Sequence, residues 1–239
     1  MTLLLDVGNS SVKWRAGELR GRCEGESVLP DLPTTPAGIW VASVASAERQ
    51  GMLTELCQQR WQKTPWFARS ERSACGVTNS YAEPSRMGVD RWLAMIAAFD
   101  VTQSPVCVVD AGSALTIDFV GAGGQHTGGY IIPGQNLMQQ ALAGGTARVR
   151  VGTSGEPSLQ PGTSTDEAVG HGLMLAQVGA VAFALEQMDM ELKLIFSGGD
   201  GASLMRLLGR GGDYREDLVL DGLFLLGTTS SRAGESVVT

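Results

Sequence analysis

Residues 105–121, PVCVVDAGSALTIDFVG, repeat the layout of residues 3–17, LLLDVGNSSVKWRAG, and this repetition decides the fold. Each copy consists of an apolar run, an Asp-x-Gly turn and a second strand-like run, a pattern that predicts a β-hairpin. Asp6 of the first copy matches Asp110 of the second. The repeating unit is about a hundred residues long, which is too long for a solenoid, so two similar domains are expected.

The rest of the chain alternates short apolar runs with helical periodicity. Strands followed by helices in each half predict an α/β architecture. The junction between the halves is expected near residues 103–105, a short polar stretch, which gives an N-terminal domain of residues 1–104 and a C-terminal domain of residues 105–239. Two helical faces are predicted from apolar residues at helical spacing, namely Met52, Leu53, Leu56 and Cys57 in one segment and Trp92, Met95, Ile96 and Phe99 in another.

The second half continues with a strand in the Gly-rich segment TGGYIIPG (127–134) and a helix at 137–142. A Gly-, Ser- and Thr-rich loop then leads to a long apolar helix over 166–188, with Thr165 and Asp166 as its expected caps. The next strand delivers SGGD (197–200) to the start of a further helix, and the polar tail 227–239 is expected to fray.

Composition excludes several classes of protein. Hydrophobic residues make up 43% of the 239, which is too many for a disordered chain. The net charge of −7 argues against nucleic acid as the main partner, because backbone binding needs clustered Lys and Arg. The four cysteines lack the grouping of a disulfide framework or a zinc site and are expected to be reduced, buried thiols.

The membrane is excluded as a partner on similar grounds. The longest nearly apolar stretch, 172–185, is interrupted by Gln177 and is shorter than the ~20 residues of a membrane span. The N-terminus reaches Asp6 after only three leucines, which is unlike a secretory signal. We therefore expect a cytoplasmic protein.

The first hairpin turn, DVGNSSVK, has the residue types of a phosphate site. Gly8 lets backbone N–H groups approach an anion, Lys13 adds a positive charge, and Asp6 suits a hydrated metal ion. Such a turn is also a common hairpin connection, and alone it is weak evidence. A second copy, together with the Gly-rich strand end SGGD, favours a nucleotide held between two hairpins. Neither a Walker loop nor a dinucleotide fingerprint occurs.

The motif GVDRW (88–92) places Asp90 and Arg91 at the start of a helix. A carboxylate there is a candidate general base for phosphoryl transfer to an alcohol, beside a candidate substrate anchor. The alternative is a surface ion pair, which is the more frequent use of such neighbours. Tyr81, in a loop without an evident packing pattern, is a candidate to close over a ligand.

Together, six motifs resemble those of the type III pantothenate kinases, in order and in rough spacing, over residues 3–227. They are DVGNSSVK, GVDRW, DAGSALTID, TGGYIIPG, TSTDEAVGHG and SGGD. This family belongs to the superfamily of acetate kinase, hexokinase and actin. The resemblance implies two duplicated ribonuclease-H-like domains, the actin-like ATPase fold, with an interdomain cleft. It also implies ATP-dependent phosphorylation of pantothenate to 4′-phosphopantothenate, the first step of coenzyme A biosynthesis.

The resemblance carries roles to particular positions. Asp90 is implied as the catalytic base and Asp110 as the ligand of a monovalent cation, K⁺ or NH₄⁺, used besides the Mg²⁺ that accompanies ATP. The family usually has Thr where this chain has Ser10 and Ser113, and serine keeps the hydroxyl. The implied ATP contacts are Asp6, Val7, Gly8, Asn9, Ser10, Ser11, Val12, Lys13 and Ser113, and the implied pantothenate contacts are Tyr81, Gly88, Val89, Asp90, Arg91 and Thr165.

Two other functions stay open at this point. Some relatives are named as accessory transcription factors, so a regulatory protein of the same fold without catalysis is one alternative. Another is a superfamily kinase that acts on a sugar or a carboxylate.

A homodimer is expected. The segments 137–142 and 166–188 are apolar on more than one face, and the members of the family that this chain resembles are dimers.

Overall fold

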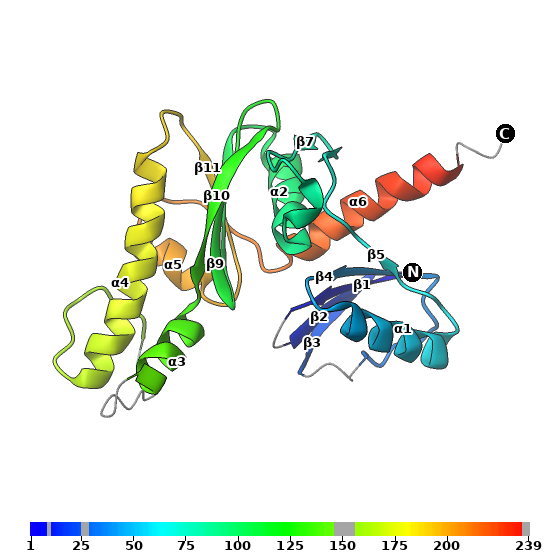
Figure 1. Ribbon diagram of the computed structural model, residues 1–239, viewed down its shortest axis with the longest axis horizontal. Coiled ribbons are helices and arrows are strands. Elements are labelled where there is room, and N and C mark those ends of the chain that lie inside the picture. The colour runs from blue at the N-terminus through cyan, green and yellow to red at the C-terminus, as the bar shows by residue number, and fades with distance from the viewer. Residues whose placement is uncertain (9–10, 25–28, 146–155, 236–239) are drawn as a thin grey trace. The chain divides into compact units, whose positions relative to one another are not determined.

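Both predicted hairpins are present in the computed structural model, which describes residues 1–8, 11–24, 29–145 and 156–235 (Figure 1). Strand β1 (Thr2–Val7) pairs antiparallel with β2 (Ser11–Ala16), and β8 (Val106–Ala111) pairs antiparallel with β9 (Ala114–Val120). In the two registers Asp6 lies opposite Lys13, and Asp110 lies opposite Thr116. The hairpin prediction is therefore confirmed in both copies.

Each hairpin forms part of a five-stranded sheet, and the two sheets have the same strand order. The first runs β3-β2-β1-β4-β5 and the second β10-β9-β8-β11-β12. In each sheet the fourth strand is parallel to the hairpin's first strand. The matching order confirms the duplication expected from the sequence. The added strands are β3 (Leu19–Glu24), β4 (Gly38–Ser43), β5 (Trp66–Phe67), β10 (His126–Pro133), β11 (Lys193–Ser197) and β12 (Asp213–Tyr214).

The helices follow the same repeat. Helix α1 (Ala47–Trp61) comes after β4, and α5 (Gly201–Leu208) comes after the equivalent β11. The remaining elements are a small hairpin of β6 (Ser73–Ala74) and β7 (Val77–Thr78), the 3₁₀ turn Pro84–Arg86, and the helices α2 (Val89–Thr102), α3 (Gln135–Gly145), α4 (Thr165–Glu186) and α6 (Leu218–Glu235).

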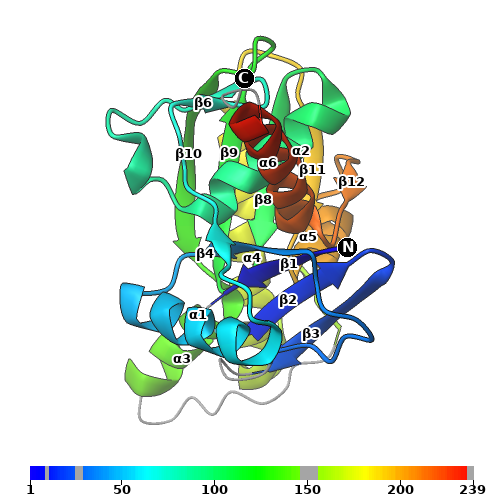
Figure 2. The same ribbon diagram turned by 90° about the vertical axis from the view of Figure 1, so that its right-hand side faces the viewer.

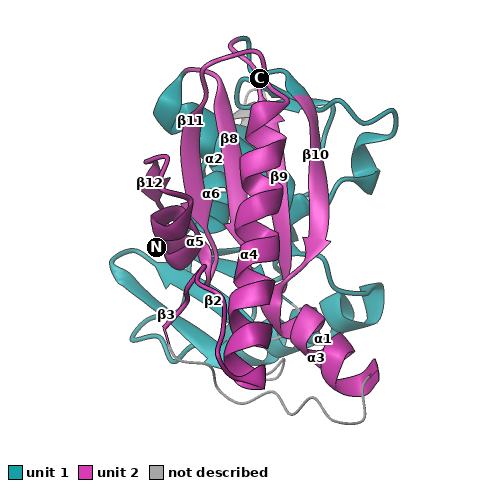
Figure 3. Ribbon diagram, turned by 90° about the vertical axis from the view of Figure 1, so that its left-hand side faces the viewer, with its two compact units in different colours: residues 1–103, 123–126, 217–239 teal, residues 104–122, 127–216 magenta. Residues whose placement is uncertain are grey.

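The chain divides into two compact units (Figure 3). Unit 1 holds residues 1–103, 123–126 and 217–239, and unit 2 holds 104–122 and 127–216. This division differs from the boundary expected at 104/105, because α6 packs along α2 and β4 of unit 1. The helices approach so closely that a Cβ at Gly222 would collide with the backbone of Leu93.

Each unit has its own apolar core. In unit 1, α1 lies across the sheet (Figure 2), and Leu53, Cys57 and Trp61 of this helix pack on Leu5 and Val41. In unit 2, α4 lies along the sheet (Figure 3). There the strand residues Cys107, Val109, Leu115, Ile117 and Phe119 meet the helix residues Met174, Val178, Val181 and Ala184. The alternation of buried positions on the strands is the period-2 pattern of a sheet covered on that face.

Several local predictions differ from the structure. Met52 was expected in the buried face of α1, but it is 47% exposed. The buried face continues instead to Trp61, one turn after Cys57. Helix α2 is buried on nearly all sides because α6 packs beside it. The tail expected to fray is helical as far as Glu235. The cap of α4 is Ser164, whose hydroxyl accepts the Glu167 N–H, so the assignment to Thr165 and Asp166 was wrong.

Helix α4 closely matches the helix expected over 166–188. Its 22 residues are enough, by length and composition alone, to cross a membrane, with a mean hydropathy of 1.7 over its most apolar stretch. One face of the helix packs on the sheet of unit 2, as a core helix does. A single helix of this kind is weak evidence for a membrane span.

Candidate active site

The start of α2 fixes the position of Asp90. Gly88 caps the helix, and its carbonyl accepts the Trp92 N–H that opens the helical ladder. Oδ1 of Asp90 accepts the N–H of Arg91 at 2.8 Å, within the first turn, where the helix dipole favours a carboxylate. A Cβ at position 88 would lie 2.5 Å from that Oδ1, so glycine is required for this placement.

The structure brings together Arg91 and Tyr81, which the sequence had marked separately. Nη1 of Arg91 donates to the Tyr81 hydroxyl at 2.9 Å, and the guanidinium carbon lies 5.8 Å from the centre of the Tyr81 ring. The Arg91 residue is only 5% exposed. A surface ion pair, the alternative considered for Asp90 and Arg91, is therefore not how Arg91 is used.

The loop that carries Tyr81 is braced by a residue that sequence reasoning missed. The guanidinium of Arg72 donates to the carbonyls of Asn79, Tyr81 and Ala82 at 2.8–3.1 Å. Buried Asn79 adds a second brace, because its Oδ1 accepts the Tyr81 N–H at 2.9 Å. No spacing in the sequence signals Arg72, because its partners are backbone carbonyls. A loop tied in this way is preorganised, unlike the closing loop suggested from the sequence.

The first hairpin, predicted to bind phosphate, is described only in part, because Asn9 and Ser10 lie outside the described residues. Asp6, one residue before the end of β1, lies directly opposite Lys13, a cross-strand pair of opposite charges. The Gly8 N–H donates to the Ser11 carbonyl at 3.1 Å and closes the turn. Val12 packs into the core of unit 1, so any ATP contact of this residue falls to its backbone.

In unit 2, three Gly-rich segments converge on the carboxyl end of β8. Asp110 lies beside Ser197 of the parallel strand β11. Gly198 has a φ of +84°, and a Cβ there would lie 2.5 Å from Asp110 Oδ1. Gly134 follows β10 and donates its N–H to the Ser113 carbonyl at 3.1 Å, at a position where a Cβ would collide with Gly112. The sequence had suggested the SGGD segment here, and Gly134 is the last residue of the Gly-rich segment TGGYIIPG.

Another carboxylate lies at the same end of the sheet. Asp200 is half-buried, its backbone N–H donates to the Ala111 carbonyl at 3.0 Å, and burial raises the pKa of its carboxyl.

Thr165 is the first residue of α4 and follows the cap residue Ser164, whose hydroxyl accepts the Glu167 N–H. Thr163 donates its N–H and hydroxyl to Glu167, and these bonds lower the pKa of that carboxyl. The S-x-x-E spacing of a capping box is the sequence signal that was overlooked.

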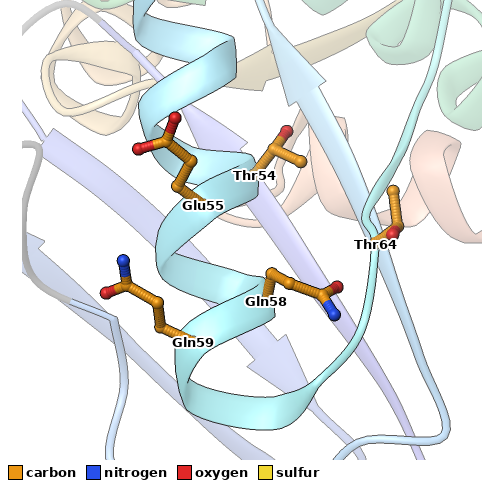
Figure 4. Close-up of a pocket in the computed structure, with 5 residues that line it drawn as sticks. All are labelled: Thr54, Glu55, Gln58, Gln59 and Thr64. Atoms are coloured by element: carbon orange, nitrogen blue, oxygen red, sulfur yellow. The ribbon is translucent and has the colours of Figure 1, made fainter.

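A shallow pocket of about 480 Å³ lies on α1, lined by Thr54, Glu55, Gln58, Gln59 and Thr64 (Figure 4). It contains none of the predicted site residues. Within the described ranges, no three His, Cys, Asp or Glu side chains are grouped to hold a metal ion. The candidate chemistry therefore rests on the start of α2 in unit 1 and on the strand ends of β1 and β8.

Comparison with known proteins identifies relatives over nearly the whole chain. The sequence profile described as type III pantothenate kinase matches residues 19–187. A type III pantothenate kinase of Marinobacter nauticus is 36% identical over 233 residues, which cover 93% of this chain and 96% of that protein. One from Pseudomonas aeruginosa strain LESB58 is 36% identical over 244 residues, covering 94% of this chain and 98% of that protein.

Solved structures share the fold at lower identity. A Campylobacter jejuni protein assigned to the Baf family of transcriptional activators is 21% identical, with a TM-score of 0.63 over 96% of this chain and 99% of that one. A Sinorhizobium meliloti protein assigned as a 2-dehydro-3-deoxygalactonokinase gives 0.58 at 12% identity, over 98% and 99% of the two chains. These likenesses show the actin-like and sugar-kinase fold, with its two duplicated α/β domains.

Proposed function

The chain belongs to the type III pantothenate kinase family, and from this premise we propose how its residues divide the work of the reaction. The protein is an ATP-dependent pantothenate kinase: it transfers the γ-phosphoryl group of ATP to pantothenate and forms 4′-phosphopantothenate, the first step of coenzyme A biosynthesis. The regulatory alternative without catalysis is not supported by these relatives.

Asp90 is the proposed catalytic base, and its geometry is the observation that carries the assignment. Phosphoryl transfer to an alcohol needs a carboxylate that accepts the hydroxyl proton as the oxygen attacks the γ-phosphorus. Oδ1 of Asp90 is fixed by the Arg91 N–H, which leaves Oδ2 to take the proton. Because Gly88 has no side chain, the carboxylate keeps this orientation.

Arg91 and Tyr81 are the proposed wall of the pantothenate site, with Gly88 and Val89 beside them and Thr165 as a further contact. Pantothenate carries a carboxylate, and a guanidinium is the side chain best suited to bind one. The Tyr81 hydroxyl holds the guanidinium of Arg91 in one orientation. Arg72 and Asn79 in turn hold the backbone of Tyr81 in place. Substrate binding therefore loses little conformational entropy in ordering this loop.

ATP is assigned to the hairpin segment of residues 6–13 and to Ser113 of the second hairpin. Kinases of this family use ATP with a divalent ion, which would supply positive charge to offset the negative charge of the phosphates. Mg²⁺ is commonly held by one or two carboxylates plus phosphates, and Asp6 near the end of β1 suits that role. Lys13, directly opposite, adds a positive charge for the phosphates.

Asp110 is the proposed ligand of K⁺ or NH₄⁺. Asp110 Oδ1 and the Ala111 carbonyl oxygen both lie close to Gly198, because a Cβ at that position would meet both. Oxygen donors of this kind suit a cation that makes modest demands on coordination geometry. A positive charge at this place would offset the repulsion between Asp110 and the phosphates.

The proposal includes a homodimer formed through α4. The outward face of this helix carries Leu175 (56% exposed) and Phe183 (64% exposed), with Gly179 between them at i, i+4 and i+8. A Cβ at Gly179 would meet nothing within 4 Å, so a second helix has room to approach. A second copy of the same stripe is a self-complementary partner. The proposal also places the enzyme in the cytoplasm, with its ATP.

The direct test is incubation of the purified protein with ATP, magnesium and pantothenate, followed by mass spectrometry for 4′-phosphopantothenate. We expect product that requires both substrates. Parallel reactions with acetate or a sugar acid in place of pantothenate test the alternative that the protein phosphorylates one of these substrates. Phosphorylation of one of these, with none of pantothenate, would overturn the proposal.

A further inference from the structure

Residues 123–126, which follow β9 and include the first residue of β10, belong to unit 1, although β9 and the rest of β10 lie in unit 2. They attach to the hairpin that precedes the Tyr81 loop. The Thr78 N–H donates to the Gly124 carbonyl at 2.9 Å, and Thr78 forms a parallel bridge with Gln125. A Cβ at Gly124 would collide with the carbonyl of Gly76, so the two segments are in close contact.

Through this segment, His126 contacts the loop that carries Tyr81. His126 is fully buried, and its Nδ1 is hydrogen-bonded to Ser80 Oγ at 2.9 Å. Its ring centre lies 6.2 Å from that of Tyr81, at an interplanar angle of 38°. Tyr81 therefore lies beside both the His126 ring and the Arg91 guanidinium.

We propose that His126 is a positioning residue for pantothenate binding. Through Ser80 and through its ring, it fixes the Tyr81 side chain where the hydroxyl meets Arg91, the residue after the catalytic base. His126 does not itself touch the substrate in this scheme. The inference rests on the proposed role of Tyr81 and Arg91 in binding pantothenate. The competing view is that His126 is only a core residue, which contributes to stability and leaves substrate affinity unchanged.

The hydrogen bond can be removed from either side. His126→Phe keeps a buried ring but loses Nδ1, and Ser80→Ala loses the hydroxyl. We expect each variant to raise KM for pantothenate about tenfold, the usual effect of losing one buried hydrogen bond, while kcat and KM for ATP change by less than about twofold. The double variant should be no worse than the worse single one, because both changes remove the same bond.

Ser73→Ala is the matched control. It removes the Ser73 hydroxyl from its 3.2 Å hydrogen bond with Thr78, across the β6–β7 hairpin. All three kinetic constants of this variant should match the parent. Thermal unfolding of every variant separates lost stability from lost affinity.

Three results would overturn the inference: an unchanged KM for pantothenate in both single variants, effects that add in the double variant, or a lowered unfolding temperature with a smaller active fraction and unaltered KM. Wild-type protein is assayed first. If it forms no phosphopantothenate, the proposed function fails, and the role of His126 falls with it. If it does and the variants equal it, only the role of His126 fails.

Discussion

The guanidinium of Arg91 donates a hydrogen bond to the hydroxyl of Tyr81 across 2.9 Å and stands 5.8 Å from the centre of the tyrosine ring. This contact joins the first turn of α2 to a loop ten residues earlier in the chain. Since Arg91 is almost fully buried, its cation faces the Tyr81 ring and hydroxyl in place of much of its water. The side chain of the residue that follows Asp90 is thereby held in one orientation.

Asp90→Asn should lower kcat by on the order of 10²–10⁴, the usual cost of removing a general base. The amide oxygen can still accept the Arg91 N–H, so the fold and ATP affinity should stay close to wild type. Steady-state kinetics and ATP titration measure these quantities. Asp100→Asn, the same change at an exposed position of the same helix, is the control and should be fully active. A wild-type rate in Asp90→Asn would mean that a group other than Asp90 accepts the hydroxyl proton.

Gly88→Ala tests whether the carboxylate must hold its observed orientation. The backbone there (φ −55°, ψ 130°) accepts alanine, but the new Cβ would lie 2.5 Å from Asp90 Oδ1 and push the carboxylate away. We expect a fall in kcat of at least about tenfold, because small misplacements of a catalytic group are costly. Circular dichroism should show an intact fold.

The control for this substitution is Gly51→Ala in α1. A Cβ at Gly51 meets nothing within 4 Å, so alanine should stabilise the helix by roughly 0.5–1 kcal/mol and leave activity unchanged. Full activity in Gly88→Ala would mean that the orientation of Asp90 is unimportant.

Local patterns in the sequence predicted the hairpins, the duplication and the position of Asp90 at a helix start. These features depend on residues close together in the chain. The bracing of Tyr81 by Arg72 and His126 depends on contacts with backbone carbonyls and on a segment 45 residues away. No periodicity encodes such contacts. The helical state of 227–235 was also missed; this stretch continues α6, which packs on α2 and β4, and Gly227 lies close to Trp40 of β4.

Asp110 can be tested by the choice of salt. Activity is compared in NaCl, KCl and NH₄Cl at equal ionic strength, with Asp110→Asn as the variant. We expect strong stimulation by K⁺ or NH₄⁺ in the parent and little in the variant, because the carboxylate is the charged ligand of the proposed site. Equal rates in all three salts would leave Asp110 with a structural role.

The cysteines should differ in reactivity. All four are free thiols, but only Cys57 and Cys107 are fully buried, while Cys23 and Cys75 are partly exposed, which corrects the expectation that all four are buried. Burial raises the pKa of Cys57 from 9.0 to about 11, so its thiolate is scarce at pH 8. Iodoacetamide at pH 8 should label Cys23 and Cys75 and spare Cys57 and Cys107 until the protein unfolds, as peptide mass spectrometry would show.

The same pKa shift has a consequence for stability. The Cys57 thiol ionises near 9.0 when unfolded but only near 11 when folded. Its contribution to the free energy of unfolding is therefore complete below pH 9 and is lost as the pH rises from 9 to 11. Cys57→Ser, compared with the parent in urea at pH 8 and pH 10.5, should show a smaller loss of stability between the two pH values. An equal loss would contradict the assignment to Cys57.

The dimer is tested on the outward stripe of α4. Phe183→Glu places a carboxylate in the middle of the proposed apolar interface, where an unpaired charge is costly, so sedimentation should show a shift from dimer to monomer at micromolar concentration. Phe224→Glu, the same change at a 51% exposed phenylalanine of α6, is the control and should stay dimeric. Thr165 begins the same helix that carries the stripe, so loss of the dimer should also raise KM for pantothenate if the partner's helix completes the site. A wild-type chain that sediments as an active monomer would remove α4 as an interface and leave its exposed apolar face without a proposed partner.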